Sequence, residues 1–272
     1  MTVPLLFFAA LMIKVDHATV AGLDIAKLQA EFVKLGLPME YGGRHPNRTT
    51  EMAAISFPDG SYLELIAKQK DADEKSFATG PWAKLIEANV GPAAWAIRTD
   101  DPAGDVKRLR AEGIRADDPE PGGRTRPDGV RLEWQTIQVG EHRGTFFPFL
   151  IHDVTPHENR VYLKGKPSVP EFSGVSKVII AVANLDEAIA RYRKAFALPA
   201  PHKSVDSDLG ATLASFEGTP VVLAAPASKD GWIADRVAKY GDLPCAFVIK
   251  GKKPGKTRWL KLEGVGGRIG IE

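Results

Sequence analysis

The sequence VDHATV (residues 15–20), followed by LDIA (residues 23–26), decides the fold, because this unit returns later in the chain. KVIIAV (residues 177–182), followed by LDEA (residues 185–188), repeats it. In each copy, a run of residues typical of a buried strand leads directly into the start of a helix. An internal repeat of this kind indicates a protein assembled from copies of one supersecondary unit.

The two copies differ where one of them carries ionisable side chains. Counting back from each Leu-Asp pair aligns His17 with Ile179. At the end of the unit, GSYLEL aligns with GTPVVL and sets Glu64 opposite Val222. A fold that accepts an apolar residue at a position does not itself require an ionisable one there. His17 and Glu64 are therefore the candidate catalytic residues.

Composition narrows the class of protein. The chain has 272 residues with 44% hydrophobic content, enough to bury one large core or two moderate ones. Its 36 basic and 34 acidic residues give a net charge of +2, which provides no general attraction to nucleic acid or membrane. We expect a small-molecule ligand, no nucleic-acid or membrane partner, and a monomer or homodimer. The single cysteine, Cys245, excludes an intramolecular disulfide and favours a reducing, cytoplasmic location and a small core residue.

The N-terminus is almost wholly apolar over residues 1–12. This stretch is shorter than the roughly 20 residues that span a bilayer. It also lacks the basic n-region of a secretory signal. We expect a short appendage, either a packed arm or the product of an upstream start codon, with Met12 beginning the natural domain.

The rest of the chain divides into four segments that each read as a strand, then a helix, then further strands. A domain is expected over 13–153, a linker over 154–174, and a second, degenerate domain over 175–272. The expected strands cover 15–20, 39–41, 52–57, 62–67, 93–98, 130–139, 146–152, 177–182, 244–249, 258–262 and 268–271. One expected helix begins at Asp24, and the others cover 81–89, 102–112, 186–197 and 231–240. Residues 117–129 are expected to form a loop.

Two features distinguish this pattern from a doubly wound parallel sheet. Each segment has one helix for several strands, and Pro58-Asp59-Gly60 predicts a tight antiparallel hairpin. The prediction is an α+β fold of tandem βαβββ modules, paired into two cup-shaped mixed sheets with the helices outside.

The first domain resembles the vicinal-oxygen-chelate superfamily, which includes glyoxalases, bleomycin-resistance proteins and extradiol dioxygenases. It is most similar to the glyoxalase-like domain proteins. The motifs that carry the resemblance are DH at 16–17 followed by LD at 23–24, GGRHP at 42–46, DGSYLELI at 59–66, RTRPDGV at 124–130 and FPFLI at 147–151. The later modules share only the general shape of the unit.

The resemblance implies that each pair of modules forms a cup, and that metal-using members bind a divalent ion through residues on first and last strands. His17 and Glu64 fall on such strands. The matching positions of the second module are Trp95 and Phe149, neither of which binds metal, so the chain departs from the family's ligand pattern. A third ligand is expected from His152 or from His45.

Three interpretations of the His17–Glu64 pair remain open. The two side chains can be ligands of Mn, Fe, Co, Ni or Zn, which accept mixed nitrogen and oxygen donors. They can be a metal-free pair in which the carboxylate orients a general base. They can also be a buried polar pair that satisfies only itself.

Further residues are candidates for substrate binding. Arg44, His45 and Arg48 lie in a Gly-rich segment expected to form a loop over the mouth of the cup, where arginines can bind an anion. The alternative is a surface turn with solvated charges.

Tyr62 shares a strand face with Glu64 and is expected to contribute a hydroxyl. Trp95 and Trp134 are candidates for the cup wall, although such aromatic residues more often belong to the core. Arg126 is a candidate substrate ligand, with an ion pair to Asp128 as its alternative role.

The predicted function is that of a small-molecule enzyme of the glyoxalase or dioxygenase type, acting in the N-terminal cup on an oxygen-rich, anionic substrate. Lyase, isomerase and dioxygenase chemistry all fit, because a fold does not determine a reaction. The alternative is a non-catalytic protein that sequesters a small molecule. The basic segment 250–261 is expected to be a solvated loop.

Overall fold

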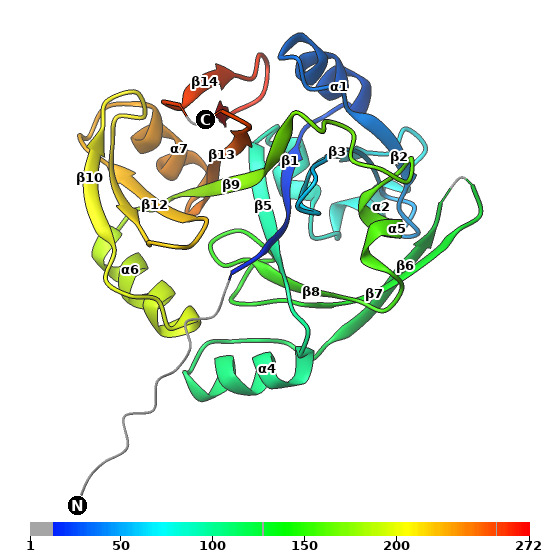
Figure 1. Cartoon of the computed structure of the whole chain (residues 1–272), viewed down its shortest axis with the longest axis horizontal. Coiled ribbons are helices and arrows are strands. Elements are labelled where there is room, and N and C mark those ends of the chain that lie inside the picture. The colour runs from blue at the N-terminus through cyan, green and yellow to red at the C-terminus, as the bar shows by residue number, and fades with distance from the viewer. Residues whose placement is uncertain (1–12, 127, 254) are drawn as a thin grey trace, which may run out of the picture.

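The computed structural model describes residues 13–126, 128–253 and 255–272. Two curled mixed sheets lie side by side with helices on the outside (Figure 1). The eight-stranded sheet has the order β2-β3-β4-β1-β5-β8-β7-β6, and the seven-stranded sheet has the order β10-β11-β12-β9-β13-β15-β14. The predicted α+β fold with two cups is confirmed. The expected appendage over residues 1–12 lies outside the described residues.

The strands of the first sheet are β1 (Val15–Ala21), β2 (Glu40–Arg44), β3 (Thr50–Ser56), β4 (Tyr62–Lys68), β5 (Gly91–Arg98), β6 (Glu120–Thr125), β7 (Arg131–Ile137) and β8 (Phe149–Asp153). Those of the second are β9 (Phe172–Ala181), β10 (His202–Asp206), β11 (Ala211–Ser215), β12 (Val221–Pro226), β13 (Leu243–Gly251), β14 (Arg258–Lys261) and β15 (Arg268–Ile271). The helices are α1 (Ile25–Lys34), α2 (Glu74–Ala78), α3 (Ala83–Glu87), α4 (Pro102–Ala111), α5 (His157–Val161), α6 (Leu185–Phe196) and α7 (Trp232–Tyr240).

Strand β1 is the centre of the first cup. It pairs in parallel with β4 and antiparallel with β5, which joins the two modules of this half. Both faces of β1 are buried along its whole length, including its polar residues Asp16, His17 and Thr19. Strands β9 and β13 have the corresponding role in the second cup.

Helix α1 forms where the sequence predicts it. The Asp24 side chain accepts hydrogen bonds from the backbone N–H groups of Ala26 and Lys27, which caps the helix start. Leu28 and Phe32 on its inner face are buried. The helix therefore covers the back of the first sheet and leaves the cup open on the other side.

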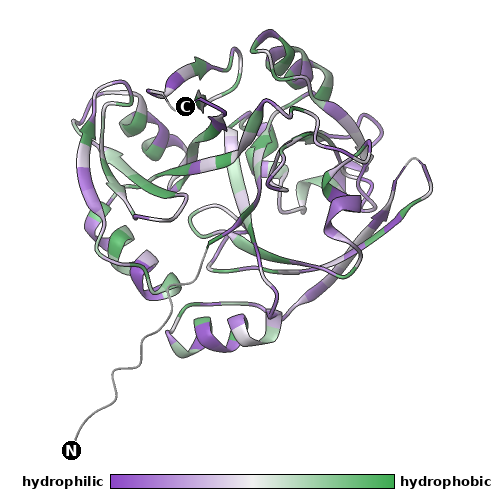
Figure 2. Cartoon of the chain, in the orientation of Figure 1, coloured by the Kyte–Doolittle hydropathy of each residue, from purple (hydrophilic) through white to green (hydrophobic). Residues whose placement is uncertain are grey.

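The two sheets share one hydrophobic core. A single cluster contains Val20 and Trp95 from the first half together with Ile180, Tyr192 and Phe247 from the second. Hydrophobic residues dominate the central strands, while hydrophilic ones gather on outer elements such as α4 (Figure 2). One face of β1 and β5 is thus committed to packing between the halves, and the opposite face lines the cup.

Several elements differ from the sequence-based expectations. Strand β6 lies inside the expected loop 117–129 and pairs with β7, although glycines and prolines are poor strand formers. The expected helix 81–89 is preceded by a second short helix, α2, and the expected linker contains α5. Cys245 is buried, and burial raises the pKa of its thiol to about 11, as suits a core residue.

The structure also corrects the alignment of the two repeats. Asn184 caps α6 in the same way as Asp24 caps α1. Aligning these two capping residues shifts the first strands of the two repeats by two residues relative to the alignment of the Leu-Asp pairs. Thr19 pairs with Glu64 in β1–β4, and Ile179 pairs with Val222 in β9–β12. Val222 is therefore the counterpart of Glu64, as predicted. The counterpart of Thr19 is Ile179, and that of His17 is Lys177.

None of the helices in the described part of the chain is both long and apolar enough to cross a membrane.

Candidate functional site

The first cup encloses a cavity of about 320 Å³ lined by side chains from β1, β4, β6, β7 and β8. His17, His45, Tyr62, Glu64 and Trp134 all line it. A larger cleft of about 1080 Å³ beside α4 contains neither His17 nor Glu64. We therefore place the candidate site in the smaller cavity, because the ionisable groups converge there.

Glu64 lies between two imidazoles. His17 Nε2 is 3.7 Å from Glu64 Oε2, and His45 Nε2 is 3.7 Å from Glu64 Oε1. Both separations exceed hydrogen-bond length, so neither imidazole is bonded to the carboxylate. The hydroxyl of Thr19 donates a hydrogen bond to Glu64 Oε2 at 3.2 Å and thereby orients the carboxylate.

The His17 ring is fixed by its sequence neighbour. The register between β1 and β5 shifts between Val15 and His17, and such a bulge interrupts the alternation of side chains. Asp16 Oδ1 thereby reaches His17 Nδ1 at 2.6 Å, although adjacent residues of a regular strand point to opposite faces. Because Asp16 is an acceptor, Nδ1 carries the proton, and in the neutral ring the Nε2 lone pair faces Glu64.

His45 is oriented in the same manner. Its Nδ1 lies 2.8 Å from the hydroxyl of Thr50, which leaves Nε2 directed at Glu64. Burial lowers the pKa of His45, while the charge of Glu64 opposes that shift. His45 is therefore neutral at neutral pH and offers a lone pair. Expected as a substrate ligand or third metal ligand, it does lie beside the pair.

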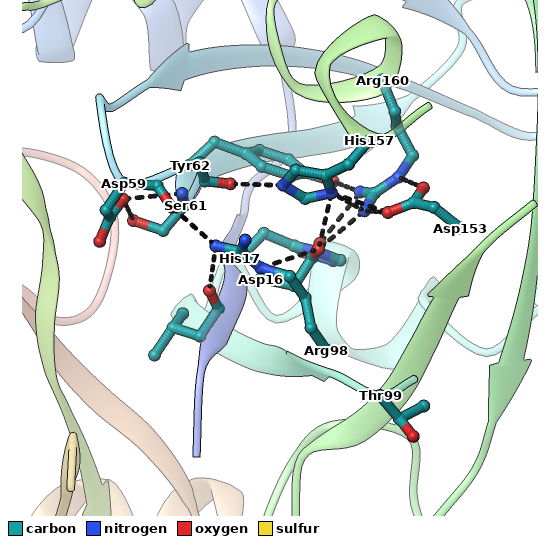
Figure 3. A network of polar contacts seen from close by, with 12 residues as sticks. Asp16, His17, Asp59, Ser61, Tyr62, Arg98, Thr99, Asp153, His157 and Arg160 are labelled. Atoms are coloured by element: carbon teal, nitrogen blue, oxygen red, sulfur yellow. Dashed lines mark hydrogen bonds and ion pairs between the residues drawn. The ribbon is translucent and has the colours of Figure 1, made fainter. Parts of the chain in front are cut away.

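Asp16 is itself held by an arginine from α5 (Figure 3). Arg160 donates to both carboxylate oxygens of Asp16, at 2.9 and 2.7 Å, and to both oxygens of Asp153, at 2.6 and 2.8 Å. It also donates to the Tyr62 hydroxyl at 2.9 Å. Burial would raise the pKa of Asp16, but Arg160 and His17 outweigh it and hold that pKa far below its usual value.

Asp16, Asp153 and His157 offer three potential metal-ligand atoms within 4.8 Å of one another. Their geometry does not fit an ion, because the Arg160 guanidinium is already bonded to both carboxylates and remains protonated. His157 bonds Asp153 through Nδ1 and the Gly60 carbonyl through Nε2. This group is an ion-pair network that supports the cup from outside.

Glu64 lies at a suitable distance from either imidazole to share an ion with it, but among the described residues His17, His45 and Glu64 do not offer three ligand atoms that all lie within 4.8 Å of one another, so the three do not surround one common ion. Ligands that are about 2.0–2.2 Å from one ion lie about 3–4 Å from each other, and both imidazoles are 3.7 Å from Glu64. Imidazole nitrogen and carboxylate oxygen are donors that Mn, Fe, Co, Ni and Zn accept. Each Nδ1 has a hydrogen-bond partner, as ligating histidines usually do.

Aromatic rings form the rest of the wall. Tyr62 stacks on His17 with ring centroids 4.8 Å apart, and Phe149 approaches the same imidazole edge-on at 5.2 Å. Trp134 packs against Phe149 and lines the cavity, as predicted. Burial raises the pKa of Tyr62 well above its usual value, so the phenol stays protonated.

Two arginines not predicted as ligands also line the cavity. Arg124 donates to the Gly42 carbonyl at 2.6 Å, and the Arg143 guanidinium lies 4.4 Å from the Phe149 ring centroid. Burial lowers the pKa of both side chains, but an arginine remains charged at neutral pH. The cavity therefore combines cationic groups with the Glu64 carboxylate.

The arginines expected over the cup mouth lie elsewhere. Arg44 ends strand β2, is exposed, and pairs with Asp71 at 2.7 Å. Arg48 is exposed in the turn between β2 and β3. Arg126 bonds Asp128 and the backbone carbonyls of Asn159 and Leu163, consistent with the alternative role given to it. GGRHP was expected to be a loop, but the pairing of β2 with β3 turns Arg44 away from the cavity.

We expect Arg44→Ala to leave both the unfolding midpoint and ligand binding in the cup unchanged, because a solvent-exposed ion pair contributes little. Urea denaturation of the variant and of wild type, at the same ionic strength, checks this. A clear loss of ligand affinity would contradict the placement of Arg44 outside the site.

Trp95 and His152 are also placed outside the cup. Trp95 pairs with Ala18 and is fully buried in the core between the halves, so Ala96 is the cup-facing residue of β5. His152 bonds the Thr99 carbonyl through Nδ1 at 2.9 Å and lines the cleft beside α4. Phe149 and Ile151 face the cup, and strand alternation turns His152 the other way.

The candidate site also includes five residues that the sequence analysis did not select: Asp16, Thr19, Arg124, Arg143 and Arg160. Asp16 adjoins His17, but regular strand geometry separates their side chains, and no sequence signal marks the bulge. Arg124 falls in the segment 117–129 that was expected to be a loop, and it lies in β6 instead. Arg160 lies in the expected linker and is 144 residues from Asp16, so only the folded chain brings them together.

The comparisons with known proteins agree with this geometry. A family profile described as a glyoxalase-like domain matches residues 15–196, more than half of the chain. The protein belongs to the glyoxalase-like domain family. No curated protein matches the chain at a significant level.

Solved structures similar to this glyoxalase-like protein include a hypothetical protein from Staphylococcus aureus, with a TM-score of 0.68 and 16% identity, covering 96% of this chain and 99% of that one. A mutant of 4-hydroxymandelate synthase from Streptomyces coelicolor gives a TM-score of 0.59 and 14% identity, covering 89% and 71%. A fusion protein of a xylose isomerase-like TIM barrel with 4-hydroxyphenylpyruvate dioxygenase gives 0.54 and 14%, covering 93% and 39%. At these identities the likeness shows the vicinal-oxygen-chelate fold alone.

Proposed function

We propose that this protein is a small-molecule enzyme of the glyoxalase or dioxygenase type that acts in the N-terminal cup. The observation that carries the proposal is the position of Glu64 between the Nε2 atoms of His17 and His45, at 3.7 Å from each. The requirements of the fold do not explain a carboxylate at this position, because the second cup has Val222 at the position of Glu64.

The proposed cofactor is a divalent transition-metal ion held by His17 and Glu64, whose ligand atoms lie 3.7 Å apart. Such an ion would supply a Lewis acid that polarises adjacent oxygens of the substrate. Asp16 fixes the proton on Nδ1 of His17, which leaves its Nε2 lone pair free to bind the ion, and the Thr50 hydroxyl holds the His45 ring beside Glu64. The Arg160 guanidinium in turn holds Asp16 in its ionised form.

The residues of the cavity wall support an oxygen-rich, anionic substrate. Arg124 and Arg143 offer positive charge to a carboxylate or another anionic group. Tyr62 stays protonated, so its hydroxyl can donate a hydrogen bond to a substrate oxygen. Phe149 and Trp134 cover the apolar part of the ligand. An oxygen-rich anion that fits about 320 Å³ is the proposed substrate.

Titration of the metal-free protein with Co²⁺, followed by its visible absorption spectrum, tests the proposal. We expect one ion per chain in wild type, with affinity reduced at least about 100-fold in His17→Ala. His152→Ala is the matched control, because that imidazole lies outside the cup. It should bind Co²⁺ as wild type does.

Two results would count against the metal site. Equal binding by His17→Ala and wild type would place the ion elsewhere. Failure of wild type to bind Co²⁺, Mn²⁺, Fe²⁺, Ni²⁺ or Zn²⁺ would leave the metal-free base or the sequestering protein as the better explanation. Turnover of a bound oxygen-rich anion separates these two.

A further inference from the structure

A second cavity, of about 740 Å³, lies next to the cup and between the two halves of the molecule. Its wall is formed by α3 and the segment 138–147 of the first half, and by α6, α7 and the residues after α7 of the second half. Pro81 and Arg143 line both this cavity and the cup. We call it the interhalf cavity. The shared wall makes it a natural extension of the candidate site.

Positive charge dominates the interhalf cavity. Lys84, Arg143, Arg191 and Lys239 line it, together with His142. Among residues 13–126, 128–253 and 255–272, no carboxylate lies within 4.0 Å of any of these four cationic groups. The chain as a whole carries a net charge of only +2, so this concentration of unneutralised charge is a local feature.

The two acidic residues of the same wall are engaged elsewhere. Glu141 pairs with Arg115 at 3.2 Å, and Asp242 accepts a hydrogen bond from the Ala183 backbone N–H at 2.8 Å. Both carboxylates keep their charge but neither pairs directly with a cationic group of the cavity, whose lining holds four cationic side chains against these two acidic ones. The electrostatic potential inside it therefore favours an anion.

Aromatic rings hold the two arginines in place. Arg143 lies over Phe149 at 4.4 Å, and Arg191 lies over Phe146 at 4.3 Å. Stacking on a ring face leaves the edge of the guanidinium available for two parallel hydrogen bonds to a phosphate or carboxylate. The segment that carries Arg143 is itself anchored, because the Gly144 carbonyl accepts a hydrogen bond from the Trp95 backbone N–H at 2.9 Å.

We propose that the interhalf cavity binds a phosphorylated tail of the substrate whose reactive head occupies the cup. Four cationic groups exceed what one carboxylate neutralises, and they suit a group carrying two or more negative charges, such as a pyrophosphate. Arg143, at the junction, contacts the connection between head and tail. The identity of the occupant as a substrate tail rests on the proposed function, whereas the anion site itself does not.

Calorimetric titration of the full chain with inorganic pyrophosphate tests this proposal. Wild type should bind one pyrophosphate per chain, and Arg191→Met/Lys239→Met should weaken that binding about tenfold or more. Lys27→Met/Lys107→Met removes the same charge from exposed positions on α1 and α4. This control should bind as wild type does.

His17→Ala should also bind pyrophosphate normally, because its change lies in the cup. Absence of binding by wild type would overturn the proposal, as would equal weakening in the Lys27/Lys107 control. Weakening in His17→Ala alone would move the anion into the cup and overturn it too. The Co²⁺ titration is unaffected by these outcomes, so failure here and failure of the proposed function are told apart.

Discussion

Replacing Asp16 with Asn should lower the free energy of unfolding by about 3–5 kcal/mol. Asp16 is fully buried, and both of its oxygens accept hydrogen bonds from Arg160. The substitution preserves shape but removes the negative charge, so the buried guanidinium keeps only Asp153 as an anionic partner. Most of the loss comes from this uncompensated charge.

Urea denaturation at neutral pH measures the effect, with Asp71→Asn as the control. Asp71 also pairs with an arginine, but both partners are exposed, so its loss should leave the unfolding midpoint unchanged. The double variant Asp16→Asn/Arg160→Met should be more stable than the sum of its single variants predicts, because the unpaired charge is gone. Full additivity would contradict a direct Asp16–Arg160 interaction.

The same contact predicts the acid sensitivity of the wild-type protein. The pKa values of Asp16 and Asp153 are both lowered in the folded state, despite burial, mainly by contacts with Arg160 and with His17 or His157. The unfolded chain therefore binds more protons below about pH 4, and the free energy of unfolding should fall as the pH drops. Asp16→Asn should show a shallower decline between pH 4 and pH 2 than wild type. An identical slope would exclude Asp16 as its source.

The double variant Thr19→Val/Glu64→Val should fold at least as well as wild type and lose Co²⁺ binding by at least about 100-fold. Ile179 and Val222 occupy the corresponding positions of the second cup, so this backbone accepts apolar side chains there. Replacing the buried carboxylate and its hydroxyl donor together leaves no unpaired polar partner from that hydrogen bond. We expect a gain in unfolding free energy of about 1–2 kcal/mol.

Thermal and urea denaturation measure the stability, and the Co²⁺ spectrum measures binding. Thr19→Val alone is the control, because it removes the hydroxyl donor but keeps the carboxylate. It should lose about tenfold in Co²⁺ affinity, less than the double variant loses. A double variant that unfolds more easily than wild type would show that Glu64 serves the fold, which is the structural interpretation of the pair. Retained binding would remove Glu64 from the ligand set.

The sequence alone predicted the modules, because the spacing of apolar residues along a strand or helix and the capping of a helix are local properties. Asp24 caps α1 as expected, and the comparison of Glu64 with Val222 identified an ionisable residue at a position that is apolar in the second cup. His17 and Glu64 do converge on one cavity, as proposed from the ends of the first module. Counting from the Leu-Asp pair gave the wrong counterpart for His17, since the cap of α6 is Asn184.

The tertiary structure alone decided which residues surround the pair. A bulge in β1 brings Asp16 to His17, and strand pairing with β5 sends Trp95 into the core. Arg160 comes from a segment that reads as a linker. The sequence of a strand specifies that its side chains alternate between the two faces of the sheet, but not the position at which a bulge interrupts this alternation. Contacts between residues more than a hundred positions apart depend on how the helices and strands pack. The sequence therefore determined the fold and the two central groups, and folding selected their partners.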